Sequence, residues 1–142
     1  MADLPPEDQP DTVSIGPVEN IPIIHDDDPR FEEERAVWSA ARKRAQAMHS
    51  PDELISGLSD ADWRVRHEVV DRLTARGKDD PRTIPALLRA VLHDPAWEVR
   101  DAAVMAVGWF EDDRVTEALR AATSDPHPEV RWSAEFKLAQ RT

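Results

Sequence analysis

The fold of this chain is decided by a seven-residue stretch that is written three times, and its middle copy reads Asp94-Pro95-Ala96-Trp97-Glu98-Val99-Arg100. The other copies are Asp60-Ala61-Asp62-Trp63-Arg64-Val65-Arg66 and Asp125-Pro126-His127-Pro128-Glu129-Val130-Arg131. Each copy begins with Asp, ends in Val-Arg and leads into apolar residues at helical spacing. The copies lie 34 and then 31 residues apart, a period typical of stacked helical pairs that bury their apolar faces against their neighbours.

The spacing predicts three helical pairs and one last single helix, over residues 29–59, 60–93, 94–124 and 125–141. Asp28, followed by Pro29, is expected to cap the first helix. Ser50 and Glu53 form a capping box for the second. We expect Gly77 to end a helix in the left-handed conformation, and Thr83 to cap the helix after it.

Residues at equivalent repeat positions should form the core, because apolar side chains recur there at helical spacing. This pattern predicts burial of Val65, Leu73, Leu88, Val99, Ala103, Leu119 and Val130.

The negative charge is unevenly distributed along the chain. Residues 1–34 contain eleven Asp and Glu against the single Arg30, whereas residues 35–142 contain 18 acidic and 17 basic side chains. The repeat region is therefore close to neutral and lacks the basic surface of a nucleic-acid-binding protein. We expect no nucleic-acid partner.

The composition also bears on location. The chain has no cysteine, which excludes disulfides and thiolate metal sites and suits a reducing compartment. No apolar run approaches the roughly 20 residues of a membrane span. The acidic start of the chain is unlike a signal peptide. The expected location is cytoplasmic, with no membrane partner.

Residues 1–28 combine five of the twelve prolines with scattered acidic residues, a composition that predicts an extended or disordered acidic tail. The tail is expected to be disordered or to lie near Arg89 and Arg120. It also contains a β-branched cluster between Val13 and Ile24, for which the alternative is a segment that docks in a groove.

The repeat resembles HEAT-like repeats, and more narrowly the short variety known from phycobilisome bilin lyases. The best match covers residues 94–123, where the residues in place are Asp94, Pro95, Val99, Arg100, Ala102, Ala103, Ala106 and Gly108. The resemblance implies an all-α, right-handed solenoid of about seven helices. It says little about function, because this family includes scaffolds, inhibitors, lyase subunits and a few enzymes.

In HEAT-like proteins, Asp and Arg residues spaced in this way form a ladder of hydrogen bonds between successive repeats. The resemblance therefore implies a structural ladder of Asp60, Arg66, Asp94, Arg100, Asp125 and Arg131. The alternative is a row of arginines that binds phosphate groups. We favour the ladder, because each Arg recurs together with its Asp in a core-forming motif.

Catalysis would have to rest on His67 and Glu68. A diiron hydroxylase of HEAT-like fold uses several His-Glu pairs at equivalent repeat positions. Here those positions hold Asp101-Ala102 and Trp132-Ser133, and one His-Glu pair is too few for a dinuclear site. The sequence therefore predicts no catalytic residue, no metal site and no cofactor.

Two groups of residues are candidates for binding a partner. Arg89 and Arg120 share a repeat position, with Arg82 and Glu117 nearby, and suit a protein or peptide contact. Trp132 and Phe136 occupy positions where the outer face of a repeat is normally polar, and no later helix covers them. A foreign partner or a second copy of the chain is favoured there over the tail, and the alternative is that both aromatics reach the core beside Phe110.

Trp63 and Trp97 share another repeat position near the start of a pair. We expect them to pack against adjoining turns, with a ligand clamp as the alternative.

The sequence as a whole predicts a non-catalytic protein–protein interaction module. It would act as a small adaptor or as an inhibitor that works by occlusion, such as an immunity-type protein, with another protein or peptide as partner. A homodimer through the last helix is a further possibility. The alternative function is an accessory subunit of an enzyme such as a bilin lyase.

Overall fold

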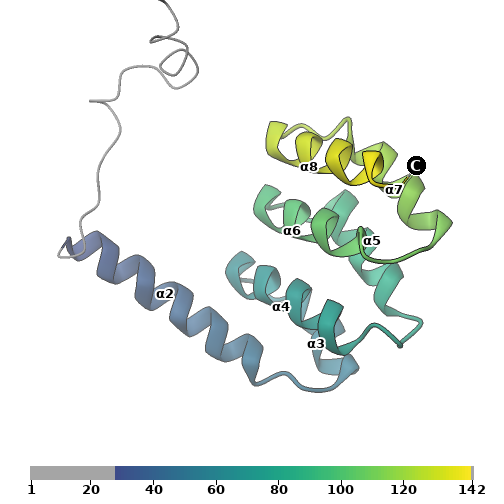
Figure 1. The fold of residues 1–142 in the computed structure, drawn as a ribbon. Coiled ribbons are helices and arrows are strands. Elements are labelled where there is room, and N and C mark those ends of the chain that lie inside the picture. The colour runs from purple at the N-terminus through teal and green to yellow at the C-terminus, as the bar shows by residue number, and fades with distance from the viewer. Residues whose placement is uncertain (1–27, 142) are drawn as a thin grey trace, which may run out of the picture. The chain divides into compact units, whose positions relative to one another are not determined.

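The computed structural model describes residues 28–141, and in this range the chain forms seven helices and no strand. The helices are α2 (Pro29–Gln46), α3 (Pro51–Gly57), α4 (Trp63–Arg76), α5 (Thr83–His93), α6 (Trp97–Val107), α7 (Asp113–Ala122) and α8 (Pro128–Ala139). The prediction of an all-α solenoid of helical pairs is confirmed (Figure 1). The predictions for residues 1–27 fall outside the described residues.

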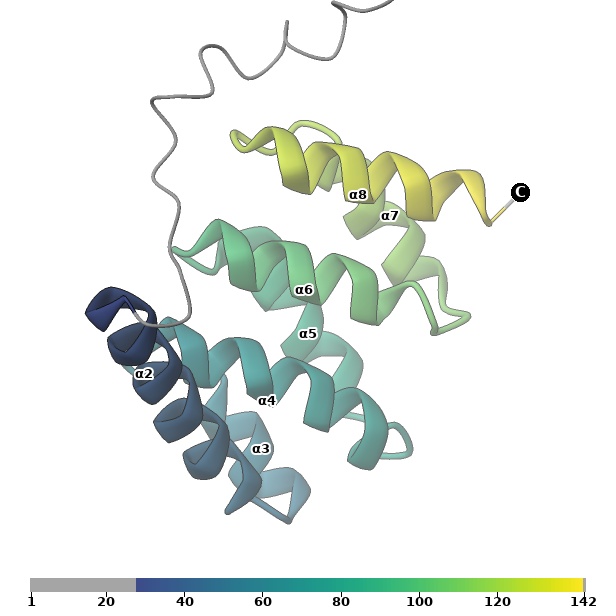
Figure 2. The same cartoon turned by 60° about the vertical axis from the view of Figure 1, so that its left-hand side comes forward.

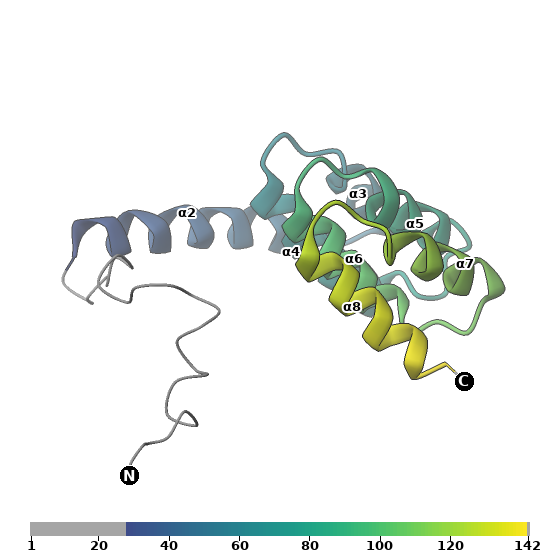
Figure 3. The ribbon, with the colours of Figure 1, turned by 90° about the horizontal axis from the view of Figure 1, so that it is seen from above.

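Within the described residues the chain divides into two units, residues 28–36 and residues 37–141. In the second unit, the first helices of successive pairs, α4, α6 and α8, lie side by side in one layer (Figure 2). The second helices, α3, α5 and α7, form the other layer, as the view from above shows (Figure 3). Each second helix packs mainly against the first helix of the following pair, α3 on α4, α5 on α6 and α7 on α8. Equivalent helices of successive pairs also pack on one another.

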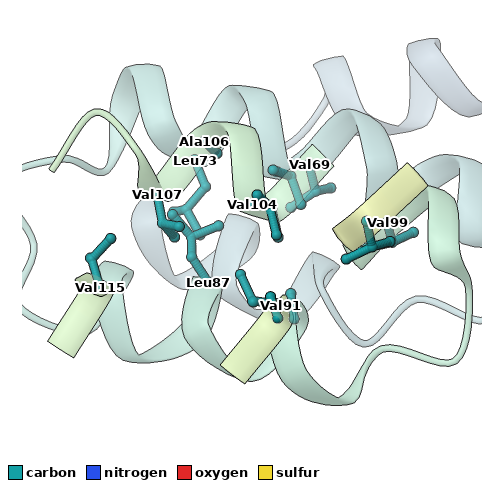
Figure 4. Close-up of a cluster of buried hydrophobic side chains, with 14 of the residues drawn as sticks. Val69, Leu73, Leu87, Val91, Val99, Val104, Ala106, Val107 and Val115 are labelled. Carbon is teal, nitrogen blue, oxygen red and sulfur yellow. The ribbon is translucent and has the colours of Figure 1, made fainter. Parts of the chain in front are cut away.

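The core lies between these layers and follows the repeat (Figure 4). Five of the predicted core residues, Leu73, Val99, Ala103, Leu119 and Val130, are fully buried, and Val65 is 1% exposed. Val70 of α4 and Val104 of α6 are also fully buried. They lie one helical turn after Arg66 and Arg100, whose side chains reach the next copy of the motif, so this second row lies on the side of the following pair. Burial of both rows is the main term that stabilises such a stack.

The prediction for Leu88 is wrong in degree, because this side chain is only half-buried. Helix α5 carries five large aliphatic side chains, and they are spread over a wider arc than its covered face. Leu87 and Val91 lie at the centre of that face, at 0% and 1% exposure, and Leu92 is 42% exposed. Leu88 therefore lies at the edge of the buried stripe, and Leu87 fills its centre.

The turn between α4 and α5 also differs from expectation. Gly77 ends α4 with φ of −108°, which is not left-handed. An added Cβ there would lie 2.6 Å from Leu73 Cδ1 and 3.0 Å from the Leu73 carbonyl oxygen, so glycine is needed for space. Thr83 does not cap α5 but is its first residue, and its hydroxyl donates to the Gly77 carbonyl at 2.5 Å. The capping box of Ser50 and Glu53 is present as predicted.

Candidate interaction surfaces

The recurrent Asp and Arg residues link one pair to the next. Arg66 donates from Nε and Nη2 to the two carboxylate oxygens of Asp94, at 2.8 and 3.0 Å. Arg100 binds Asp125 in the same two-pronged way, at 2.8 and 3.1 Å. The Nη1 atoms of Arg66 and Arg100 donate to the carbonyls of Asp60 and Asp94, six residues earlier. Each arginine thus ties its own turn to the next one.

The two ends of this series differ from its middle. Asp60 forms an ion pair with Arg44, with 2.7 Å between its Oδ2 and the Nη2 of the arginine. Arg131 donates to the Asp125 carbonyl at 2.7 Å, and no later aspartate lies within the described residues. Arg66 and Arg100 are largely covered, and each is already bound to an aspartate. These arginines therefore do not present a row to phosphate groups.

The environment of Asp125 favours its ionised form. Burial by itself would raise the pKa of this carboxyl, but hydrogen bonds from Arg100 and from the His127 backbone, together with the positive charge of Arg100, lower its pKa below the ordinary 3.8. The ladder therefore contains a carboxylate that stays charged although it is mostly covered.

The arginines on or next to helices α5 and α7 differ in whether a carboxylate already binds them. Arg82 is held by Asp80 at 2.8 Å and by Asp52 at 2.6 Å, and its hydrogen bonds lower the pKa of Asp80 to about 2. Arg89 of α5 and Arg120 of α7 are exposed and form no ion pair within residues 28–141. Arg89 and Arg120 are therefore available to a partner, together with the exposed Glu117 on α7.

A shallow groove lies beside Arg89. It has a volume of about 470 Å³, and its lining includes Ile55, Leu58, Arg89 and His93. Ile55 occupies in α3 the position that Arg89 occupies in α5, so the cationic row consists of only two residues. The groove is also lined by Ser59, Asp60, Arg66 and Asp94, and the last two bind each other in the ladder.

His67 and Glu68 do not form a metal site. His67 is half-buried, with its ring 5.6 Å from the ring of Trp38 in an edge-to-face contact, and Glu68 pairs with Arg42 at 3.7 Å. Within residues 28–141 no group of three or more His, Asp or Glu side chains could hold a metal ion.

Trp63 and Trp97 are half-buried against neighbouring elements. Trp63 contacts Trp38 edge-to-face at a centroid distance of 5.4 Å. Trp97 stacks on His127, in the turn that opens the next pair, at 4.0 Å and an interplanar angle of 6°. Both tryptophans thus pack between consecutive elements of the stack. This agrees with the expected packing role and not with the alternative of a ligand clamp.

Trp132 and Phe136 lie on the outer face of α8 and stack on one another, with ring centroids 5.4 Å apart and 12° between the planes. They are 60% and 43% exposed. The alternative that both reach the core beside Phe110 is therefore wrong. Two large rings that contact each other and remain open to solvent form a site where a partner could be bound by apolar contact.

Two further exposed apolar residues lie on or just after α6, which packs beside α8, and the sequence did not mark them as candidates. Met105 occupies in α6 the position of Phe136 in α8, and Trp109 follows directly after α6; they are 37% and 76% exposed. Lys137 of α8 places its ammonium 5.0 Å from the Trp109 ring and its aliphatic chain over Gly108. We call Met105, Trp109, Trp132 and Phe136 the aromatic face.

A signal for Trp109 exists in the sequence. It follows Gly108, just beyond the end of the helix, so this large apolar residue does not belong to the buried stripe and can be expected at the surface. Its proximity to α8 depends on how α6 and α8 pack side by side, which the repeat pattern does not specify.

The helices between residues 28 and 141 include none that is long and apolar enough to cross a membrane. A search of curated proteins finds no match to the chain. A family model described as HEAT repeats matches residues 51–139, which is more than half of the sequence and includes all three copies of the Asp-to-Arg motif. The match is to HEAT repeats in general and does not distinguish the bilin-lyase type. The chain therefore belongs to the HEAT repeat family.

Proposed function

We propose that this protein is a non-catalytic interaction module that binds another protein through the aromatic face. HEAT repeats commonly mediate protein–protein interaction, which supports the general class. The observation that carries the proposal is the stacked, exposed pair of Trp132 and Phe136. Tryptophan and other aromatic residues of this kind dominate the binding energy of protein interfaces.

The aromatic face is not placed where another repeat would stack. The residues of α4 and α6 that the following pair covers are Val70 and Val104, both fully buried. Their equivalent in α8 is Glu135, which is exposed, and a further pair packed there would bury a carboxylate. Trp132 and Phe136 lie on the outer side of α8, away from that edge, so their exposure suits a partner better than a further repeat.

Within this proposal the protein acts as a small adaptor or as an occluding inhibitor, for example an immunity-type protein that covers a toxin enzyme. Arg89, Arg120 and Glu117 form a second contact region, to which Arg82 contributes less because it is paired. A cytoplasmic location is part of the proposal and rests on the absence of cysteine. Nucleic acid is not a proposed partner, since the aromatic face carries no basic surface.

The test is quantitative affinity capture with mass spectrometry. The wild-type protein is compared with the double variant Trp132→Ala/Phe136→Ala and with Val37→Ala/Leu92→Ala, which removes two apolar side chains that are 39% and 42% exposed elsewhere. We expect the first variant to lose a specific partner that the control variant retains. Retention of the same partners by all three proteins would place the binding surface elsewhere.

The accessory-subunit alternative is tested by the same experiment. In that case the captured protein is an enzyme whose activity depends on this chain, and the complex contains the chromophore or metal that the enzyme uses. A homodimer is tested by sedimentation at several protein concentrations, in which the aromatic double variant would lose self-association.

A further inference from the structure

The aromatic face is flanked by carboxylates that have no cationic partner. Glu129 and Glu135 of α8 are exposed, and Glu98 of α6 is half-buried. At about 100° per residue, Glu135 lies on one side of Trp132 and Glu129 lies just beyond Phe136 on the other. None of these three glutamates forms an ion pair with another residue of the described range 28–141.

Within residues 28–141, Lys137 and Arg131 of α8 contact uncharged groups of the fold and form no ion pair with these glutamates. Lys137 is 8% exposed, and its ammonium lies over the Trp109 ring. Arg131 directs its Nη1 to the carbonyls of Asp125 and Pro126, at 2.7 and 3.1 Å. The surface that a partner meets therefore combines stacked aromatic rings with carboxylates that form no ion pair within residues 28–141.

We infer that the partner contributes a basic amphipathic segment, with apolar side chains against Trp132 and Phe136 and with Lys or Arg opposite Glu129 and Glu135. This inference rests on the proposed function, because it names the chemistry of the partner at the same site. A Lys or Arg beside exposed indole and phenyl rings also gains a cation–π contribution. Charges at the rim of an interface act on specificity and association rate.

The same charges argue against the other two occupants. Residues 1–27 contain seven acidic residues and no Lys or Arg, so this segment would bring negative charge to a negative surface. In a homodimer formed by two aromatic faces, Glu129 and Glu135 of each copy would approach those of the other. The formal net charge of −11 per chain further opposes such a dimer.

The inference can be tested with synthetic peptides whose apolar pattern is fixed. Three fluorescently labelled 16-residue helical peptides would carry Leu and Trp at the same positions, and Lys, Gln or Glu at all others. A helix of about 16 residues is roughly 24 Å long. A fourth peptide is residues 7–27 of this chain. Fluorescence anisotropy with the full-length protein, at low and high salt, gives the four affinities.

We expect the Lys peptide to bind most tightly and to weaken as salt rises. The variant Trp132→Ala/Phe136→Ala should weaken it by more than about thirtyfold, as expected for two aromatic anchors. The variant Glu129→Gln/Glu135→Gln should weaken it on the order of tenfold and flatten its salt dependence. The matched control Glu33→Gln/Asp79→Asn removes the same charge from exposed sites elsewhere, and Val37→Ala/Leu92→Ala is the apolar control; both should bind as the wild type does.

Several results would overturn the inference. If the Gln or Glu peptide binds as tightly as the Lys peptide and still requires Trp132 and Phe136, the site stands but the partner is not basic. Tight binding of the peptide 7–27 would identify the tail as the occupant. Self-association that is lost in the aromatic variant would identify a second copy. Binding of the Lys peptide that does not depend on Trp132 and Phe136 would remove the site itself, and with it the proposed function.

Discussion

Among single residues, Arg100 and Asp125 join the pair α6–α7 to the last helix through a largely covered ion pair. Their side chains are 13% and 7% exposed, so removing one partner leaves a mostly buried charge without a counterion. We expect Arg100→Ala to lower the free energy of unfolding by about 3–5 kcal/mol, measured by urea titration. Arg114→Ala is the control, because its ion pair with Asp112 is exposed, and its unfolding curve should hardly move. Equal losses for the two variants would contradict the role assigned to the ladder.

The ionisation of Asp125 adds a pH dependence. Its pKa is lowered in the folded state from the ordinary 3.8, so the folded state binds this proton less readily than the unfolded state does. The stabilisation is then complete above about pH 4 and is lost as the pH falls through the lower folded pKa. The stability difference between the wild type and Asp125→Asn should be largest above pH 4 and shrink in more acidic solution. A difference that does not change with pH would exclude this linkage.

The sequence predicted which residues belong to the Asp and Arg series but not how they pair. Within one copy the two residues lie six apart, and over that distance each arginine reaches the backbone carbonyl of its aspartate, not the carboxylate. The carboxylate partners lie 28 and 25 residues away, in the next pair. That pairing follows from how α4, α6 and α8 stack, and the resemblance to HEAT-like repeats supplied it where spacing within one copy could not.

For a single helix, the register of α5 gives the sharpest prediction. Leu87 is fully buried, whereas its neighbour Leu88 is half-buried at the edge of the same stripe. Leu87→Ala should cost about 2–5 kcal/mol of unfolding free energy, and Leu88→Ala a smaller amount, below about 2 kcal/mol. Thermal or urea unfolding of the two variants checks this order, and a larger loss at Leu88 would mean that α5 is rotated relative to its observed register.

The turn that ends α4 provides a second prediction for a helix. A Cβ on Gly77 would meet Leu73 and the Thr83 hydroxyl, at 2.6 and 2.9 Å, and both are held in the core. Gly77→Ala should therefore destabilise the protein by about 1–3 kcal/mol. Gly108→Ala serves as control, since its Cβ would meet only the flexible Lys137 chain and should cost less. A neutral Gly77→Ala would show that the turn can open without loss.

These two helices show where prediction from the sequence succeeds and where it stops. Periodic apolar residues located the helices, and capping residues such as Ser50 gave a start that the structure contains. The prediction of a left-handed conformation at Gly77 was wrong, because a glycine at a helix end can be required for close packing as well as for a positive φ. The half-burial of Leu88 and the place of Trp109 beside α8 depend on tertiary packing, which local periodicity does not determine.

In the whole molecule, charge and apolar surface are separated along the chain. Residues 1–27 carry seven of the 29 acidic side chains and none of the 18 basic ones, while the aromatic face lies on α6 and α8. A strongly negative segment tethered to a binding module attracts a basic ligand from a distance without having to contact it. The tail can thus act on how quickly a basic partner arrives.

This separation leads to a prediction for removal of residues 1–27, which changes the formal net charge from −11 to −4. The association rate of the Lys peptide should fall, and its salt dependence should weaken, while the dissociation rate stays the same, because steering changes the encounter and leaves the bound contacts intact. Stopped-flow anisotropy at several salt concentrations measures both rates. The melting transition of the helical unit should be nearly unchanged, since a proline-rich acidic segment buries little apolar surface. A faster dissociation after the deletion would show that the tail contacts the bound peptide, and a higher affinity would show that it covers the aromatic face.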